Sequence, residues 1–288
     1  MSQQSNLSLP IIDIGPIIHT TDSDGNYQDE QAAANVIKQI GQACERFGFF
    51  YIKNHGIDEE LVDKLMSEGR SFFNKPLDYK NQYHMKNSKV YRGYFELGGE
   101  LTKLGHSIMA AIGESLGLGR DFFRNKFTSE PFIPFRLFHY PSDPNAKFEN
   151  GEERFGVGKH QDYGCLTLLK QDNVGGLEVE DRSTGEWISA PPLEKTFVVN
   201  IGDMLERWTC GRYKAVPHRV KNLTNQDRLS APFFFDPNFE CVVTPLEELA
   251  LTEEEKTKWP PVKYGDYILA KVFAVFPELK SAALKYEE

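Results

Sequence analysis

Hydrophobic residues follow two different patterns along the chain. In the first 116 residues, apolar side chains recur every three or four positions, which is typical of amphipathic helices. This spacing predicts helices over 31–47, over 58–75 and over 101–116. The apolar runs at 9–14 and 49–52 are bounded by turn residues and predict two short strands.

Beyond residue 130, short β-rich segments separated by glycine, proline, asparagine and aspartate replace the helical spacing. This pattern favours a barrel or sandwich, with the helical first half packed against it as one unit. A polar helix is expected from Glu247 to Lys258. The predicted strands are Ile133–Tyr140, Cys165–Gln171, Gly176–Glu180, Glu186–Ile188, Phe197–Ile201, Ala215–Val220, Leu229–Phe235 and Cys241–Thr244.

The composition is that of a folded globular chain. Its 288 residues suit one large domain or a tight pair, and 40% hydrophobic with 26% charged residues exclude a disordered or collagen-like protein. With 42 acidic against 33 basic side chains the formal charge is −9, so nucleic acid is not an expected partner. No apolar run suits a membrane span and the first residues lack a signal-peptide pattern, so we expect a cytoplasmic location and no membrane partner. The cysteines lack metal-binding spacing and are expected to be reduced thiols: Cys44, Cys165, Cys210 and Cys241.

One histidine and one aspartate stand two residues apart in the β-rich half. In an extended chain a period of two sends His160 and Asp162 to the same side, and His218 lies in another predicted strand that a barrel could bring alongside. Two imidazoles and one carboxylate on one face of an octahedron leave three positions open, which suits Fe(II) for oxygen chemistry. No cysteine belongs to the cluster, and a closed zinc site would need a fourth ligand that the sequence does not supply.

A second pair of residues lies in a later predicted strand. Arg228 and Ser230 are again two residues apart, so both face one way. A guanidinium binds a carboxylate through two parallel hydrogen bonds and a hydroxyl adds a third, which suits the far carboxylate of a dicarboxylic acid. Each feature also has a plainer explanation, since a histidine in a strand is usually a core residue and an Arg-x-Ser pair usually lies on the surface. Alternation would send Phe234 to the side of Ser230, although core packing explains all of 233–235 as well.

Together these motifs resemble the iron and 2-oxoglutarate-dependent dioxygenases of the isopenicillin N synthase-like family. The resemblance covers nearly the whole chain. It implies a mainly β fold with flanking helices, whose core is a double-stranded β-helix (jelly roll). The motifs that carry it are Leu9-Pro10-Ile11-Ile12-Asp13, 47–56, Arg92-Gly93-Tyr94, Phe138-His139-Tyr140-Pro141, 160–164, 175–179, Asn200-Ile201-Gly202-Asp203, Pro217-His218-Arg219-Val220 and Arg228-Leu229-Ser230.

The resemblance also implies a reaction and its cofactors. A small organic substrate would be hydroxylated, or desaturated or cyclised, with O2 and with decarboxylation of 2-oxoglutarate to succinate and CO2. Ascorbate is a further candidate cofactor. The implied roles are iron binding by His160, Asp162 and His218, binding of the 2-oxoglutarate C5 carboxylate by Arg228 and Ser230, and contact with this cosubstrate by Tyr140.

The first half departs from the family at one point. Residues 1–102 resemble the N-terminal region and 103–288 the oxygenase core with C-terminal helices. In the family a long stretch separates these parts, including a strand next to the substrate pocket and the first turns of a long helix, but here they are joined directly at about residue 102. We therefore expect a shortened variant that keeps the metal site and turns over poorly. Arg92 and Tyr94 are candidate contacts for a polar substrate, and a salt bridge in a loop explains them equally well.

Three other functions stay open from the sequence. An iron oxidase of the same architecture that needs no 2-oxoglutarate would keep the Arg-x-Ser pair, and succinate formation separates the two. A degraded, non-catalytic fold could act as a binding module. A zinc hydrolase could use the same three ligands, but no general base is evident near them. The sequence identifies neither the substrate nor the oligomeric state.

Overall fold

Short strands and helices alternate along this structure, a computed structural model that describes residues 8–18, 26–83, 96–142, 155–221, 225–249, 252–275 and 277. The expected substrate contacts Arg92 and Tyr94 lie outside the described residues. In chain order the elements are β1 (Ile11–Asp13), α1 (Gly15–Ile18), α2 (Glu30–Arg46), β2 (Phe49–Lys53), α3 (Glu59–Phe73), α4 (Leu77–Asn81), α5 (Glu96–Ser115), α6 (Phe122–Lys126), β3 (Pro131–Phe132), β4 (Phe138–Tyr140), β5 (Val157–His160), β6 (Leu166–Gln171), β7 (Leu177–Glu180), β8 (Trp187–Ser189), β9 (Phe197–Ile201), α7 (Asp203–Trp208), β10 (His218–Val220), β11 (Arg228–Asn238), β12 (Val242–Val243), η3 (Glu247–Leu249), α8 (Glu253–Lys258), β13 (Val262–Lys263) and α9 (Tyr264–Val275).

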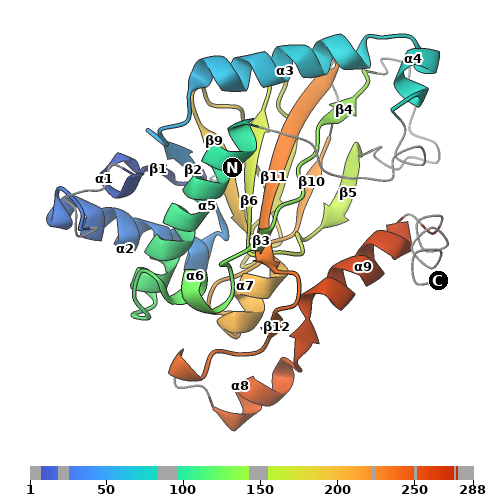
Figure 1. Cartoon of the computed structure of the whole chain (residues 1–288). Helices are drawn as coiled ribbons and strands as arrows, with labels where there is room; N and C mark the ends of the chain where they lie inside the picture. Colours follow the sequence, from blue (N-terminus) through green and yellow to red (C-terminus); the bar gives the residue numbers. More distant parts are fainter. Residues whose placement is uncertain are drawn as a thin grey trace, which may run out of the picture.

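Two sheets packed face to face form the centre of the molecule (Figure 1). The larger sheet has seven strands in the order β1-β2-β9-β6-β11-β3, with β4 also paired to β11. The smaller sheet has four strands in the order β5-β10-β7-β8. Apart from β1 with β2, the described strand pairs of both sheets are antiparallel. Two facing antiparallel sheets are the arrangement expected for a jelly roll.

The larger sheet is buried on both faces. Its inner face packs against the smaller sheet through residues such as Tyr51 and Val198. Its outer face packs against the helices through Phe233 and Phe235, which belong to a separate and larger core cluster. Because alternate side chains point to opposite faces, β11 is apolar on both sides along most of its length. A polar side chain on the inner face is therefore an exception that needs a partner.

Helices α2 and α5 cover the outer face of the larger sheet (Figure 1). Helix α2 begins at the cap residue Asp29, whose carboxylate accepts a hydrogen bond from the Ala32 amide at 2.9 Å. It ends before Gly48, whose φ of +61° is one that few other residues adopt. A Cβ atom at Gly105 of α5 would lie 2.3 Å from the Phe235 ring, so glycine lets this helix approach β11 closely.

Helix α5 runs without a break across the junction at residue 102. It begins at Glu96, five residues before the start that the spacing predicts. Leu97, Leu101, Leu104 and Ile108 are spaced three or four residues apart and are all buried in the larger core. The residues before the junction thus supply the first turns of this helix, so its apolar stripe stays continuous.

The other predicted elements agree with the structure except in detail. The expected strand over 133–140 is regular only in β4, and the expected helix over 247–258 is divided into η3 and α8. His160 ends β5 and Asp162 lies in the following loop, so the pair does not share one extended strand. The spacing does not predict the short helices α4, α6 and α7, because five or six residues complete fewer than two turns.

Two further expectations concern membranes and thiols. Within the described ranges, no helix combines the length and the apolar character that crossing a membrane requires. The four cysteines are all free thiols, as predicted, with Cys44 and Cys165 buried. Burial raises the pKa of both buried thiols, so they stay protonated and inert.

Candidate metal centre and cosubstrate pocket

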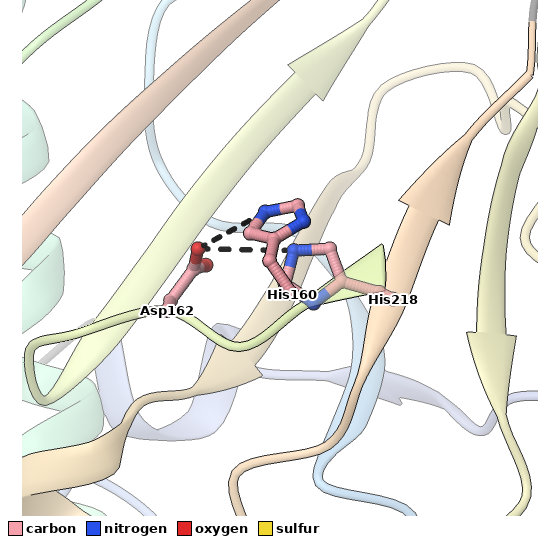
Figure 2. Close-up of side chains that lie close together, drawn as sticks. All are labelled: His160, Asp162 and His218. Atoms are coloured by element: carbon pink, nitrogen blue, oxygen red, sulfur yellow. Dashed lines mark ion pairs between the residues drawn. The ribbon is translucent and has the colours of Figure 1, made fainter. Parts of the chain in front are cut away.

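Three side chains that the sequence singles out for a metal lie together (Figure 2). His160 ends β5 and His218 begins β10, and these strands pair with the two histidines directly opposite. Their ring centroids are 4.1 Å apart, and Oδ1 of Asp162 lies 3.7 Å from Nε2 of each histidine. Possible ligand atoms of the three residues all lie within 4.8 Å of one another, and the described part of the chain holds no second group of this kind. One metal ion can therefore contact all three side chains.

Backbone carbonyls fix the protonation of both imidazoles. Nδ1 of His160 lies 2.9 Å from the Gly158 carbonyl oxygen, and Nδ1 of His218 lies 3.2 Å from that of Val216. A carbonyl oxygen only accepts hydrogen bonds, so Nδ1 carries the proton in each ring. Nε2 is then left with a free lone pair, and it is Nε2 that faces Asp162. This is the tautomer that a metal-binding histidine needs.

The carboxylate of Asp162 is held from behind by two side chains. Thr167 Oγ1 and Asn200 Nδ2 both donate hydrogen bonds to Oδ2, at 2.5 and 2.7 Å. Thr167 lies on β6 and Asn200 on β9, and the register of these strands places the two residues opposite each other. Oδ1 is thereby left facing the imidazoles, as a ligand that binds a metal through one oxygen would be.

The protonation states of the buried ligands suit a cation. Burial raises the pKa of the Asp162 carboxyl, but the two nearby imidazoles and the hydrogen bonds to its carboxylate outweigh burial and leave the pKa below its usual value. Burial and the neighbouring His160 lower the pKa of His218, against the pull of Asp162. At neutral pH the group is therefore an ionised carboxylate beside a neutral imidazole, which are the forms that bind metals.

Two glycines allow the loop that carries Asp162 to pack against the start of α7. A Cβ atom at Gly202 would lie 2.3 Å from the carbonyl oxygen of Gly164, and a Cβ atom at Gly164 would meet Asp236. In this close packing the Asp203 amide donates to the Asp162 carbonyl at 2.9 Å, and the Met204 amide donates to the Gly164 carbonyl at 3.0 Å. The backbone around the ligand is thus fixed as firmly as its carboxylate.

A buried arginine lies on the inner face of β11. Arg228 is fully buried, its Nε donates to the Gly175 carbonyl at 2.6 Å, and its Nη2 donates to Gln171 Oε1 at 3.1 Å. Nη1 is buried as well, and within the described residues it has no hydrogen-bond partner. A buried guanidinium with a free donor and no hydrogen-bonded carboxylate is costly unless a ligand supplies the anion.

Ser230 and Tyr140 complete the surroundings of this guanidinium. Ser230 is 2% exposed and lies two residues from Arg228 on the same face of β11. Tyr140 of β4 pairs with Arg228 across the strands, and the guanidinium carbon lies 4.8 Å from the centre of its ring. The structure thus brings together the arginine, the hydroxyl and the tyrosine that the sequence singles out, next to the buried Gln171.

One strand connects the metal ligands to the arginine. On β6, Thr167 holds Asp162 and Gln171 holds Arg228, and the two positions are about 13 Å apart along the strand. Phe234 pairs with Thr167 on the same face, so its expected inward direction agrees with the register.

Comparisons with known proteins show which family the chain belongs to. The family described as the 2OG-Fe(II) oxygenase superfamily matches residues 132–237, and the family described as the N-terminal part of non-haem dioxygenases in morphine synthesis matches residues 9–128. A protein of Dictyostelium discoideum named "Probable iron/ascorbate oxidoreductase" is 37% identical, over 96% of this chain and 97% of its own. The 1-aminocyclopropane-1-carboxylate oxidase of Dictyostelium mucoroides is 31% identical, over 91% and 95%. The chain therefore belongs to the 2OG-Fe(II) oxygenases of the isopenicillin N synthase-like family.

A solved structure with the same fold confirms the predicted architecture. A full-length protein of Neurospora crassa, crystallised with alpha-KG and 5-formyluracil, superimposes with a TM-score of 0.81 over 94% of this chain and 97% of its own, at 23% identity. At that identity the likeness shows the fold alone. The double-stranded β-helix with flanking helices is thus confirmed, and the members of this family depend on Fe(II) and 2-oxoglutarate.

The comparison with the Dictyostelium discoideum relative also bears on the expected shortening. The alignment runs over 360 positions, more than the 288 residues of this chain, so the relative contains residues that have no counterpart here. Helix α5 shows that the chain closes the junction at residue 102 within a regular helix. The apolar core is not interrupted at that point.

Three functional side chains are absent from the sequence predictions. Thr167, Asn200 and Gln171 position the metal ligand or the arginine, and each is a buried polar residue on the inner face of a central strand. A signal exists in β6, where Thr167 and Gln171 interrupt an apolar run at an even spacing. Spacing alone does not show which group they contact, because their partners are distant in sequence.

Proposed function

We propose that His160, Asp162 and His218 bind Fe(II), and that the inner face of β11 binds 2-oxoglutarate through Arg228 and Ser230. With these groups the chain would oxidise a small organic molecule, by hydroxylation, desaturation or cyclisation, while 2-oxoglutarate is converted to succinate and CO2. Tyr140 would contact the cosubstrate. The observation that carries the proposal is the buried Nη1 of Arg228, which has no hydrogen-bond partner among the residues that the structure describes. It lies on the inner face that also carries the side chains holding Asp162.

The arginine is prepared for a carboxylate in several ways. Its Nε and Nη2 are already used by Gly175 and Gln171, so the guanidinium is fixed in one plane before a ligand arrives. Burial lowers the pKa of Arg228 while Tyr140 and Asp172 act against this, and an arginine stays protonated in proteins. The hydroxyl of Ser230 stands on the same face and can donate a second hydrogen bond. A fixed and desolvated donor pair binds an anion more tightly than a mobile one.

The three metal ligands are equally prepared. Their geometry brings two nitrogen atoms and one carboxylate oxygen close to one shared point, and a set of three protein ligands leaves coordination positions for other ligands, which fits Fe(II) in an oxygenase. When bound, a ferrous ion with 2-oxoglutarate and dioxygen would supply the oxidising power. The residues of this chain would hold the carboxylate of Asp162 in one orientation, and backbone carbonyls at Nδ1 of both histidines would direct Nε2 toward the metal ion.

An iron oxidase that does not use 2-oxoglutarate is the second candidate, and the similarity to a 1-aminocyclopropane-1-carboxylate oxidase favours considering it. The two candidates differ in one product. We would incubate the protein with Fe(II), ascorbate and 2-oxoglutarate in air and measure succinate. Succinate that forms in the parent and is lost in Arg228→Met supports the proposal. Turnover of an added substrate without any succinate would establish the oxidase instead.

Three broader statements complete the proposal. We propose that residues 1–102 and 103–288 act as one structural unit, supported by β1 and β2, which extend the larger sheet, and by α5, which spans the boundary. A cytoplasmic location is supported by the four free thiols. The shortening at residue 102 would leave the metal centre intact, because the ligands and Arg228 lie far from the junction in sequence. It would slow turnover, because the stretch that is absent here includes, in the family, a strand next to the substrate pocket.

A further inference from the structure

The segment that leads into His218 has no regular secondary structure. The sequence predicts a strand from Ala215, but β10 begins only at His218, and residues 214–217 belong to no strand. Outside a strand, no ladder of backbone hydrogen bonds fixes the direction of each peptide group. Val216 nevertheless presents its carbonyl oxygen to Nδ1 of His218, which leaves the lone pair of this imidazole on Nε2. Other groups must therefore hold this segment in place.

Two side chains bind both polar groups of the Ala215 backbone. The Ala215 amide donates to Glu206 Oε2 at 3.1 Å, and the Ala215 carbonyl oxygen accepts a hydrogen bond from Gln161 Nε2 at 2.6 Å. Glu206 lies on α7, whereas Gln161 lies between His160 and Asp162 in the chain. Glu206 and Gln161 together form a clamp on this peptide, the Ala215 clamp.

The surroundings of the Ala215 clamp protect its hydrogen bonds. Ala215 is fully buried and Glu206 is 8% exposed, so water competes little for these contacts. Arg182, in the turn between β7 and β8, places Nη1 3.3 Å from Glu206 Oε1 and 3.5 Å from the Ala215 carbonyl oxygen. The buried carboxylate of Glu206 thus has both a cation and a backbone amide as partners.

Gln161 joins the two segments that carry the candidate metal ligands. His160 and Asp162 come from one segment and His218 from another (Figure 2). The strands β5 and β10 pair at the two histidines, but their register shifts further along β10. On the other side of this pair, the hydrogen bond from Gln161 to Ala215 takes the place of a strand ladder. The distance between the two segments therefore depends on this side chain as well as on the sheet.

We propose that the Ala215 clamp positions the metal ligand His218, an assignment that rests on the proposed function of the metal centre. Gln161 and Glu206 hold Ala215 from both sides. The next residue, Val216, then keeps its carbonyl oxygen at Nδ1 of His218, so that Nε2 faces the position of the metal ion. Neither side chain of the clamp belongs to the group of metal-ligand candidates, so both act through the backbone. Removing a partner that orients a metal-binding imidazole typically lowers metal affinity by about 10- to 100-fold.

Metal binding without oxygen or cosubstrate tests this role. We would titrate metal-free protein with Co(II), whose visible absorption bands depend on the geometry of its ligands, and record the melting temperature of each metal-free variant. Gln161→Met keeps the length of the side chain but loses the donor to Ala215. We expect the dissociation constant of Co(II) to rise about tenfold and the bands to change, because the imidazole of His218 is held less firmly. The melting temperature should stay close to that of the parent, since Gln161 is only partly buried.

Two variants of Glu206 separate positioning from a merely structural role. Glu206→Leu loses the acceptor for the Ala215 amide and should weaken Co(II) binding about tenfold, as Gln161→Met does. Glu206→Gln keeps one acceptor oxygen and should recover most of the Co(II) affinity that Glu206→Leu loses. If Glu206→Leu does not fold, Gln161→Met decides the outcome by the comparison of its Co(II) affinity and its melting temperature with those of the parent.

A matched control is Gln39→Met, because Gln39 donates to the Asn35 carbonyl on an exposed part of α2. It should match the parent in Co(II) affinity and in the Co(II) bands. Unchanged Co(II) affinity and bands in Gln161→Met would overturn the proposal, and so would a lower melting temperature without any change in Co(II) binding. An equal loss of affinity in Gln39→Met, or a loss in Glu206→Gln as large as in Glu206→Leu, would also overturn it. If the parent binds no Co(II), the proposed metal centre fails and not merely the role of the Ala215 clamp.

Discussion

Replacing Arg228 by lysine tests how the cosubstrate is held. Lysine keeps the positive charge but loses the planar fork, so at most one strong hydrogen bond to a carboxylate remains. In the parent, Nε donates to the Gly175 carbonyl and Nη2 to Gln171 Oε1, while Nη1 has no partner in the part of the chain that the structure describes. A lysine ammonium would have to serve these two acceptors and the ligand with a single group. We therefore expect weaker 2-oxoglutarate binding in Arg228→Lys.

The expected loss of 2-oxoglutarate affinity follows from the number of hydrogen bonds that lysine cannot make. One charge-assisted hydrogen bond contributes about 1.5–3 kcal/mol, which corresponds to about a 10- to 150-fold change in affinity. We would measure it by anaerobic calorimetry, titrating 2-oxoglutarate into protein loaded with Mn(II). The affinity for Mn(II) should stay unchanged, because Arg228 is not among the three metal-ligand candidates.

A matched control is Arg212→Lys, since Arg212 forms an exposed ion pair with Glu45. It should bind 2-oxoglutarate with the affinity of the parent. Equal 2-oxoglutarate affinity in Arg228→Lys and the parent would refute the assignment of Arg228. A simultaneous loss of Mn(II) would instead mean that the substitution damages the fold of the site.

Three further predictions concern the metal ligand and a buried acid. Asp162→Ala should lose stoichiometric Fe(II), measured by metal analysis after desalting, because two protein ligands remain. Thr167→Val should weaken metal binding about tenfold in a competition titration while the melting temperature changes little, because one of the two donors to Asp162 Oδ2 is lost. Burial raises the pKa of Asp236 to about 8 despite a hydrogen bond from Tyr264, so the folded state keeps a proton that the unfolded chain releases above about pH 4. The free energy of unfolding should then fall by about 1.4 kcal/mol for each pH unit between these values. We would measure it by urea unfolding of the metal-free protein, and Asp236→Asn should lack this fall. Parallel pH profiles for the two proteins would contradict the prediction.

The sequence singles out the three candidate metal ligands because the required residue types are rare in a strand context. The spacing of His160 and Asp162 and the later His218 are enough to suggest the group, and the structure places them within reach of one ion. The spacing of two residues explains only in part why the side chains of His160 and Asp162 lie together. Asp162 lies beyond the end of β5, and hydrogen bonds from β6 and β9, not strand alternation, direct its carboxylate.

Contacts between distant segments are the part that spacing does not reveal. Gln171 lies 57 residues from Arg228, and Asn200 lies 38 residues from Asp162, so only the folded sheets show that they meet. Helix α5 begins earlier than predicted for another reason, because Leu97 continues its apolar stripe before the predicted start.

We expect one ferrous ion and one 2-oxoglutarate to bind next to each other between the two sheets of this chain. The most direct measurement adds Fe(II) and then 2-oxoglutarate to the protein without oxygen and follows the visible spectrum. We expect a weak band that saturates at one iron per chain, requires 2-oxoglutarate, and is absent in Asp162→Ala. No band in the parent, or the same band in Asp162→Ala, would contradict it.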